Sequence, residues 1–253
     1  MADATMTLTF GGRAAIVTGS ASGIGAQVAK LLVGAGIRTH CLDRAETPLF
    51  EGADKGLQQV HTVDIADLDG LTRALAGDLH DVAYVVNCAG IHSDTGYAGV
   101  GLAEWDRLLK VNLVGAYNVV ELARPHLVTQ PVAAVVNVAS LEAHRVIALS
   151  NPDPTPHYAA SKAALAMLTR TAARALAPSG VRVNSVSPGF VATPMASQHG
   201  DTTALPPALQ DRVPLARFAQ PDEIAHVVAF LLSDQAGYIT GSDLVVDGGF
   251  SLT

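Results

Sequence analysis

Apolar residues along the chain follow two alternating periods. Short runs rich in β-branched residues recur, and they predict strands because such side chains pack well on extended backbone. These runs occupy residues 13–18, 38–43, 59–64, 82–87, 133–140, 181–187 and 242–247. Between them lie longer segments rich in alanine and leucine, whose apolar residues are spaced as on one face of a helix. Strands that alternate with helices predict βαβ units and a parallel sheet.

The predicted strands also indicate how the sheet is covered. Several of them are apolar almost throughout, as in a sheet packed between helices on both faces. The chain has no low-complexity linker and no break in composition. We therefore predict one α/β domain over residues 1–253, with a doubly wound parallel sheet of about seven strands. Residues 189–219 are rich in Pro, Thr and Gly and leave this alternation, so we expect a substrate-loop excursion there.

The composition narrows the class of protein. Hydrophobic residues make up 49% of the chain and charged residues 15%, which favours a large buried core. The net charge of −7 offers no basic patch for nucleic acid or for an anionic membrane. No apolar run is long enough to span a bilayer, and the first residues do not show the basic-then-apolar pattern expected of a secretion signal. Cys41 and Cys88 lie in apolar runs, as expected of packing residues in the reducing cytoplasm. The nine histidines show no paired spacing for zinc, so we expect no metal.

Residues 157–162, HYAASK, place Tyr158 and Lys162 four positions apart at the start of a predicted helix. Residues with this spacing share one helix face. A nearby ammonium stabilises a phenolate and lowers its pKa from about 10. Tyr158 would then exchange a proton at neutral pH. On these six residues alone, an ordinary aromatic residue beside a solvated lysine is the alternative.

A glycine cluster follows the first predicted strand. Gly19, Gly23 and Gly25 leave the backbone bare where the strand turns into a helix, a place suited to a pyrophosphate. The next predicted strand ends at Asp43, whose carboxylate can accept hydrogen bonds from both ribose hydroxyls of an adenosine and would repel a 2′-phosphate. We therefore predict NAD in preference to NADP. Arg44 argues the other way, because a guanidinium can pair with a 2′-phosphate.

An ordered set of motifs resembles the short-chain dehydrogenase/reductase family over nearly the whole chain. The motifs are TGSASGIG at 18–25, Asp43, VD at 63–64, NCAG at 87–90, Asn112, Ser140, YAASK at 158–162, SPG at 187–189 and DGG at 247–249. The resemblance implies a Rossmann-like, NAD(P)-binding domain. It also implies an oxidoreductase that transfers a hydride between a secondary alcohol, or its ketone, and nicotinamide.

The resemblance implies four catalytic residues. Tyr158 would be the general acid and base, and Lys162 would lower its pKa while bonding the nicotinamide ribose. Ser140 would hold the substrate oxygen at the carboxyl end of its strand. Asn112 would open its helix locally and hold a water that links the lysine to solvent.

The resemblance also implies a cofactor-binding set, in which Asp64 contacts the adenine, Ser187 flanks the nicotinamide and Thr193 reaches its carboxamide. The set is Gly19, Ser22, Gly23, Ile24, Gly25, Asp43, Arg44, Asp64, Ile65, Asn87, Ala89, Gly90, Tyr158, Lys162, Pro188, Gly189, Val191 and Thr193.

The chain departs from the family pattern between Ser140 and Tyr158. Seventeen residues separate the two, more than in similar proteins, and Pro152, Pro154 and Pro156 predict an irregular loop there. Because it starts at the active site, we expect this loop to shape the substrate pocket. The substrate candidates from the chain are Ser140, Glu142, His144, Phe190 and Met195, with His92 and Ser93 as further polar candidates and Ile91 and Leu141 as apolar wall. For Glu142 and His144 the alternative is a solvated side chain, and His157 is expected to be structural.

Four functions remain open at this stage. The first is an NAD-dependent secondary-alcohol dehydrogenase or ketone reductase, acting on a small molecule. An NADPH-dependent 3-oxoacyl-thioester reductase is the second, and a cis-diol or sugar dehydrogenase with Glu142 or His144 reading a neighbouring hydroxyl is the third. A non-catalytic dinucleotide sensor would disrupt the serine, tyrosine and lysine, which are all present here. By analogy with the family, and because helices 102–130 and 157–177 carry more alanine and leucine than one buried face needs, we expect a homotetramer.

Overall fold

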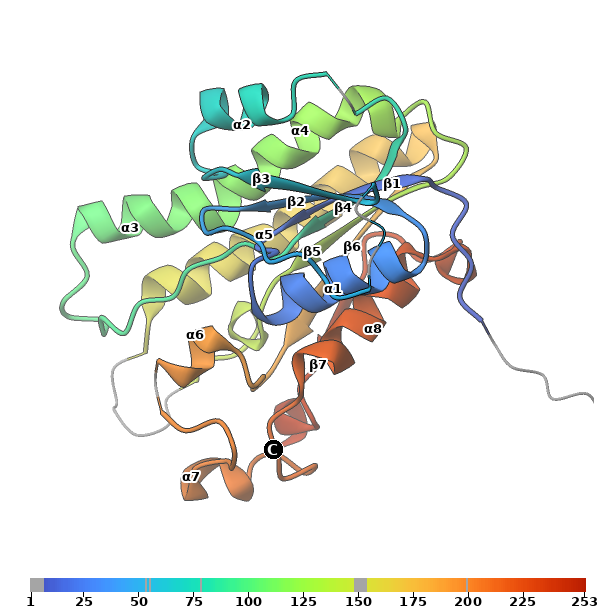
Figure 1. The fold of residues 1–253 in the computed structure, drawn as a ribbon. Coiled ribbons are helices and arrows are strands. Elements are labelled where there is room, and N and C mark those ends of the chain that lie inside the picture. The colour runs from blue at the N-terminus through green and yellow to red at the C-terminus, as the bar shows by residue number, and fades with distance from the viewer. Residues whose placement is uncertain (1–6, 53, 55, 78, 148–153, 199) are drawn as a thin grey trace, which may run out of the picture.

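Seven parallel strands form a single sheet in the computed structural model, which describes residues 7–52, 54, 56–77, 79–147, 154–198 and 200–253 (Figure 1). Their spatial order is β3-β2-β1-β4-β5-β6-β7. The strands are β1 Ala14–Thr18, β2 Arg38–Asp43, β3 Gln58–Thr62, β4 Val82–Asn87, β5 Ala133–Val138, β6 Val181–Pro188 and β7 Asp243–Val246.

Helices connect these strands. The α-helices are α1 Gly23–Gly34, α2 Leu68–Ala74, α3 Leu102–Leu109, α4 Ala116–Leu127, α5 Pro156–Leu176, α6 Pro194–Ser197, α7 Pro207–Gln210 and α8 Pro221–Leu232. A π-helical segment, Lys110–Gly115, joins α3 to α4. Short 3₁₀ turns span Leu141–Ala143, Ala177–Ser179, Asp234–Ala236 and Phe250–Leu252. Within the described part of the chain, none of the helices has both the length and the apolar character needed to cross a membrane.

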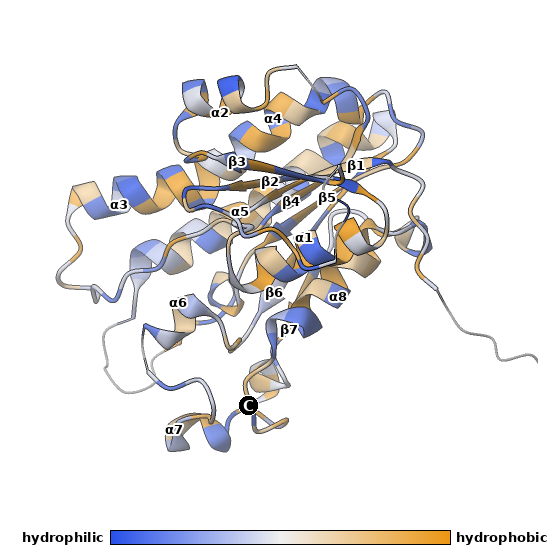
Figure 2. Ribbon diagram, in the orientation of Figure 1, coloured by the Kyte–Doolittle hydropathy of each residue, from blue (hydrophilic) through white to orange (hydrophobic). Residues whose placement is uncertain are grey.

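The strand order reverses between β1 and β4, so that helices cover both faces of the sheet (Figure 1). Alternate residues of β1 show the two layers. Ala15 and Val17 belong to a core with α1 and α8, whereas Ala14 and Ile16 belong to a second core with α2, α4 and α5. Figure 2 shows the hydrophobic residues concentrated in the central strands and on the inner sides of the helices. The predicted doubly wound α/β fold is confirmed.

All seven predicted strands are present, and the differences lie at their ends. The run 133–140 leaves the strand after Val138, because Ser140 adopts extended backbone as the N-cap of the following 3₁₀ turn. The run 59–64 is shifted to Gln58–Thr62. Hydrophobic patterning therefore located all seven strands and the ends of several of them, but not every end.

The loop before Tyr158 ends earlier than the sequence led us to expect. Pro156 is the first residue of α5 rather than part of the loop. Proline suits this position because its missing N–H has no partner within a helix in any case. Pro154 lies outside regular structure, as predicted, and Pro152 lies outside the described residues.

The excursion 189–219 carries two short helices, α6 and α7, in place of regular alternation. A third hydrophobic cluster anchors it. Leu205, Leu209 and Val213 from the excursion pack with Leu141 and Phe250, and all five are buried. The excursion is thereby held against the turn that follows β5 and against the C-terminal 3₁₀ turn.

Candidate active site

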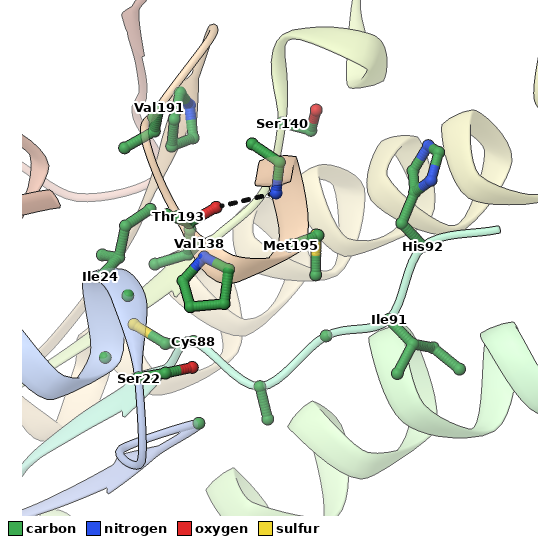
Figure 3. Close-up of a pocket in the computed structure, with 18 of the residues that line it drawn as sticks. Ser22, Ile24, Cys88, Ile91, His92, Val138, Ser140, Val191, Thr193 and Met195 are labelled. Carbon is green, nitrogen blue, oxygen red and sulfur yellow. Dashed lines mark hydrogen bonds between the residues drawn. The ribbon is translucent and has the colours of Figure 1, made fainter. Parts of the chain in front are cut away.

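A cavity of about 580 Å³ opens at the carboxyl ends of the central strands. This is the edge where open α/β sheets bind their ligands. Figure 3 shows its walls: Ser22 and Ile24 come from the turn into α1, Cys88 and Ile91 from the segment after β4, and Thr193 and Met195 from the excursion. Thr193 is fixed by the Ala196 amide, which donates to its hydroxyl at 3.3 Å.

The glycine turn fits only residues without a side chain. Gly19 and Gly23 have left-handed φ angles of +70° and +56°. A Cβ on Gly19 would lie 2.7 Å from the Ala89 backbone nitrogen, and one on Gly25 would lie 2.1 Å from the Gly19 carbonyl oxygen. The backbone segments after β1 and β4 therefore pack directly on one another.

The N-terminus of α1 faces this cavity without a cap of its own. The Ser22 side chain makes no capping hydrogen bond, and the first turn contains no acidic residue. Its free amide groups and the helix dipole therefore favour an anion there. Bare glycines, an uncapped helix start and the size of the cavity together fit the pyrophosphate of a nicotinamide dinucleotide.

Two carboxylates border the same end of the cavity. Asp43 accepts hydrogen bonds from the Ala21 and Ala45 amides at 3.0 and 2.9 Å, which fix its carboxylate at the end of β2. Asp64 accepts from the Ala66 amide at 2.9 Å. Arg44 lines the cavity beside Asp43 and is exposed.

Tyr158 and Lys162 lie on one face of α5 and both line the cavity, as the spacing predicted. The Lys162 ammonium lies 5.8 Å from the centre of the Tyr158 ring and donates to the Val138 carbonyl oxygen at 2.8 Å. Both residues are buried. The His92 ring packs edge-on against Tyr158, with 4.6 Å between ring centres.

The direction of the Tyr158 pKa differs from our expectation. Burial raises the pKa of Tyr158, the charge of Glu142 raises it further, and contact with the Ser140 hydroxyl offsets part of the effect. Burial lowers the pKa of Lys162 to about 8. The expected lowering of the Tyr158 pKa was wrong for this geometry, because desolvation outweighs any effect of the ammonium.

Ser140 lines the cavity in contact with Tyr158. It caps the 3₁₀ turn Leu141–Ala143, and its hydroxyl oxygen accepts from the Glu142 amide at 3.2 Å. The oxygen is thereby held in place while its proton remains able to donate into the cavity.

Asn112 lies in the middle of the π-helical segment and does not line the cavity. Its amide oxygen accepts from the Ile91 backbone nitrogen at 2.8 Å, and its amide nitrogen donates to the Ile91 carbonyl and the Ser161 hydroxyl, each at 3.0 Å. The local opening of the helix that we expected is present as a π-helix, a form often found at functional sites. Asn112 thus joins the segment after β4 to α5.

The cavity brings together most of the residues proposed from the sequence. The cofactor candidates that line it are Gly19, Ser22, Gly23, Ile24, Gly25, Asp43, Arg44, Asp64, Ile65, Ala89, Gly90, Tyr158, Lys162, Pro188, Gly189, Val191 and Thr193. The substrate candidates and apolar wall residues that line it are Ile91, His92, Ser140, Leu141, Glu142, Phe190 and Met195.

Three further candidates lie outside the cavity. Asn87 donates to Ala116 and Asn137, at 3.3 and 2.8 Å, and joins β4 to its neighbours instead of lining the cavity. His144 and Ser187 both bond the buried carboxylate of Asp243. Because this charge draws the imidazole away from the cavity, His144 is not placed to contact a substrate there.

The polar side chains near His157 form a separate group. Ser93 and Thr95 donate to Glu104, and the Thr95 bond measures 3.1 Å. His157 is fully buried, with its Nε2 3.7 Å from a Glu104 oxygen. This group packs α3 against α5 behind Tyr158, which agrees with a structural role for His157.

Several lining residues were missed from the sequence. Arg107 and Val111 line the cavity from α3 and the π-helical segment. Their spacing of four, ending one residue before Asn112, is the signal that points to them. Ile147, Gln198 and Phe218 come from irregular segments, where no periodic pattern exists to find them. Within the described ranges, no group of three or more His, Cys, Asp and Glu side chains is placed to hold a metal ion.

Comparison with known proteins places the chain in a family. A family model described as enoyl-(acyl carrier protein) reductase matches residues 19–251. A crystal structure titled as a short-chain type dehydrogenase/reductase from Mycobacterium marinum superposes with a TM-score of 0.87 and 30% identity, covering 97% of this chain and 98% of that one. The protein is a short-chain dehydrogenase/reductase.

Curated members of the short-chain dehydrogenase/reductase family are similar over nearly their whole length. The 3-oxoacyl-[acyl-carrier-protein] reductases of Staphylococcus aureus and Thermotoga maritima are each 34% identical, over 94% of this chain and 97% of theirs. A ligand-free aldohexose dehydrogenase from Thermoplasma acidophilum has a TM-score of 0.82 at 28% identity, with 96% and 97% of the two chains covered. This family member is therefore an NAD(P)-dependent oxidoreductase acting on CH–OH groups.

Proposed function

We propose that this protein transfers a hydride between a secondary alcohol, or its ketone, and NAD, with Tyr158 as general acid and base. The observation that carries the proposal is the convergence of Ser140, Tyr158 and Lys162 on the cavity that also holds the glycine turn. A non-catalytic dinucleotide sensor has no need of that convergence.

Each of these side chains has a defined task. When bound, the nicotinamide supplies the hydride acceptor or donor. In reduction the Tyr158 phenol gives its proton to the forming alkoxide, and its raised pKa keeps it protonated until then. In oxidation the Tyr158 phenolate, stabilised by the Lys162 ammonium, takes the alcohol proton and becomes the phenol. Ser140 donates to the substrate oxygen and stabilises the charge that develops on it. Asn112 positions Ile91 and Ser161 beside them.

The preference for NAD rests on Asp43. Its carboxylate is held at the cavity edge by two backbone amides, at the end of the strand that follows the glycine turn. Negative charge there favours ribose hydroxyls and disfavours a 2′-phosphate. We also propose the cytoplasm as the location, supported by the two free cysteines.

The second candidate is an NADPH-dependent 3-oxoacyl-thioester reductase. The names of the curated relatives in S. aureus and T. maritima support it, and so does the exposed Arg44 beside Asp43. Titration of the purified protein with NADH and NADPH separates the two candidates. Tighter binding of NADPH together with reduction of a 3-oxoacyl thioester would replace the first candidate by the second.

The Tyr158→Phe variant tests the acid–base assignment. The variant keeps the ring that packs against His92 but lacks the hydroxyl group that exchanges the proton. We therefore expect turnover of a secondary alcohol to fall by about 10²–10⁴-fold. The affinity for the cofactor should change little, which shows that the variant is folded. The assignment is wrong if the variant turns over as fast as the parent.

A further inference from the structure

One carboxylate in the cavity has no task in hydride transfer. Glu142 follows Ser140 by two residues, and the 3₁₀ turn holds it against the cavity wall. Its charge acts on Tyr158, so the carboxylate lies near the position where the substrate oxygen meets Ser140 and Tyr158. A side chain at this position is placed to contact the substituent on the carbon next to the reacting carbon of the substrate.

The bonding of Glu142 leaves one of its oxygens for a ligand. Thr155, just before α5, donates to Oε2 at 3.1 Å and fixes the orientation of the carboxylate. Among the residues that the structure describes, none donates to Oε1. Above its pKa of about 7 the Glu142 carboxylate is ionised and only accepts hydrogen bonds, so Oε1 then selects a substituent that donates.

The surroundings of Glu142 define the rest of the substrate. Leu141, Ile147 and Phe190 line the same cavity and suit a compact carbon skeleton. A carboxylate on the substrate would be repelled by Glu142, whereas a neutral hydroxyl donates to Oε1 without bringing a second charge into the cavity. His144, the other polar candidate, bonds Asp243 outside the cavity.

We propose that Glu142 determines the substrate class by accepting a hydrogen bond from a hydroxyl on the carbon next to the reacting carbon. The favoured substrates are vicinal diols in oxidation and α-hydroxy ketones in reduction. In oxidation the hydride leaves the reacting carbon for the nicotinamide, the proton of its hydroxyl goes to Tyr158, and a carbonyl forms. The neighbouring hydroxyl is not consumed. This inference rests on the proposed function, and it narrows the substrate of the same site.

Paired substrates test the proposal. We would measure kcat/KM of the intact protein at about pH 8, above the pKa of Glu142, with whichever cofactor binds more tightly, for butane-2,3-diol against butan-2-ol and for cis-cyclohexane-1,2-diol against cyclohexanol. The diol should be preferred by about tenfold or more in at least one pair, as expected for a hydrogen bond to an enclosed carboxylate. Because both members of a pair use Tyr158 alike, the ratio cancels changes in its pKa.

Variants assign the preference to Glu142. Glu142→Leu should bring the ratio of kcat/KM for the diol to kcat/KM for the matched mono-alcohol to about one. Glu142→Gln should lower it less, because an amide oxygen still accepts a hydrogen bond. His144→Ala is the matched control and should keep the parent ratio. Cofactor affinity, measured by titration, reports whether each variant is folded, and the Gln variant serves if the Leu variant is not.

Other outcomes overturn the proposal. Equal kcat/KM within both pairs in the parent contradicts it, and so does a diol preference that survives in both Glu142 variants. A stronger preference for 3-aminobutan-2-ol would show that the carboxylate selects a cation instead. If no secondary alcohol, diol or ketone reacts at all, the proposed function itself fails, which is a distinct result.

Discussion

Tyr158 and Lys162 are enclosed together, and desolvation moves their pKa values in opposite directions. The pKa of Tyr158 rises and that of Lys162 falls to about 8, so burial favours the neutral form of each. Glu142 follows the same rule, because burial raises the pKa of its carboxyl to about 7 while the Thr155 hydrogen bond opposes the change. The pKa values of these three groups are thus set mainly by how far each side chain is buried in the cavity wall.

Glu142 should make the stability of the protein depend on pH. Its pKa is about 7 in the folded chain against an ordinary value of 4.5, so between these values the folded state holds a proton that the unfolded state has released. Stability should therefore fall as the pH rises from about 4.5 to 7. We expect a loss of about 2 kcal/mol, less than full enclosure would give because the carboxyl borders an open cavity.

Denaturant unfolding of the parent and of Glu142→Gln at about pH 5 and about pH 7.5 measures this effect. The glutamine variant should lack the loss. His157 contributes in the opposite sense, because burial lowers its pKa, but its contribution cancels between parent and variant. Equal pH dependence in the two proteins would contradict the enclosure of Glu142.

Asp43 and Arg44 should act oppositely on cofactor choice. Asp43→Asn removes the negative charge but keeps an amide oxygen for the Ala21 amide, so the ratio of NADP to NAD affinity should rise by about tenfold. Arg44→Ala is the matched variant and should lower that ratio, because it removes the cation that can pair with a 2′-phosphate. Dissociation constants of both cofactors measure the effect. A ratio unchanged by Asp43→Asn would remove the basis for NAD.

Single residues also show the limit of inference from the sequence. The spacing of Tyr158 and Lys162 predicts a shared face because a helix has one periodicity. The direction of the Tyr158 pKa was not predictable, since it depends on how closely distant segments enclose the ring. Glu142 and His144 looked equivalent in the sequence, and only the 3₁₀ turn and the carboxylate of Asp243 separate them.

The elements differ in how far patterning could predict them. Side chains along a strand alternate between the two faces of the sheet, and helices cover both faces here. Apolar runs in the sequence were therefore sufficient to find all seven strands. The segment 102–130 looked like one helix, but it consists of α3, a π-helical segment and α4. The opening of the helix at Asn112 was predicted from the family resemblance and not from residue spacing. Spacing could not show it, because the opening depends on hydrogen bonds of Asn112 with Ile91 and Ser161, which are distant in the sequence.

Two glycines of α1 should respond in opposite ways to alanine. In Gly25→Ala the new Cβ would lie 2.1 Å from the Gly19 carbonyl oxygen, so the turn must move and cofactor affinity should fall by tenfold or more, with about 2 kcal/mol or more lost in stability. In Gly34→Ala the Cβ meets nothing within 4 Å, and helix propensity should add about 0.5–1 kcal/mol. Thermal unfolding and cofactor titration measure both. Normal cofactor affinity in Gly25→Ala would contradict the close packing of the turn.

At the scale of the whole molecule, the site depends on segments far apart in sequence. The third hydrophobic cluster joins the excursion 189–219 to Leu141 and Phe250, so the part of the cavity wall that contains Leu141 is held by the C-terminal 3₁₀ turn. The same cluster packs against the turn that carries Glu142. Changes at the C-terminal end are thereby connected to the substrate side of the cavity.

Exposed apolar side chains on the surface of the molecule indicate that the protein self-associates. Val114, Tyr117 and Met167 are about half exposed, at 45%, 47% and 54%, and Leu102 is 89% exposed. They lie on α3, the π-helical segment, α4 and α5, and α5 packs against both α3 and the π-helical segment. Apolar side chains gathered on neighbouring helices are typical of a contact surface between copies. These side chains support self-association through these helices, and by analogy with the family we expect the assembly to be a homotetramer.

Sedimentation velocity tests this expectation on the parent and on Met167→Glu. The parent should sediment as a tetramer at micromolar concentration, and the variant should shift to smaller species because a charge inside an apolar contact is costly. Leu49→Glu is the control, since Leu49 is similarly exposed, at 61%, but lies just after β2. It should leave the assembly intact. A monomeric parent would contradict the expectation, whereas a tetramer that Met167→Glu leaves unchanged would place the contact on another face.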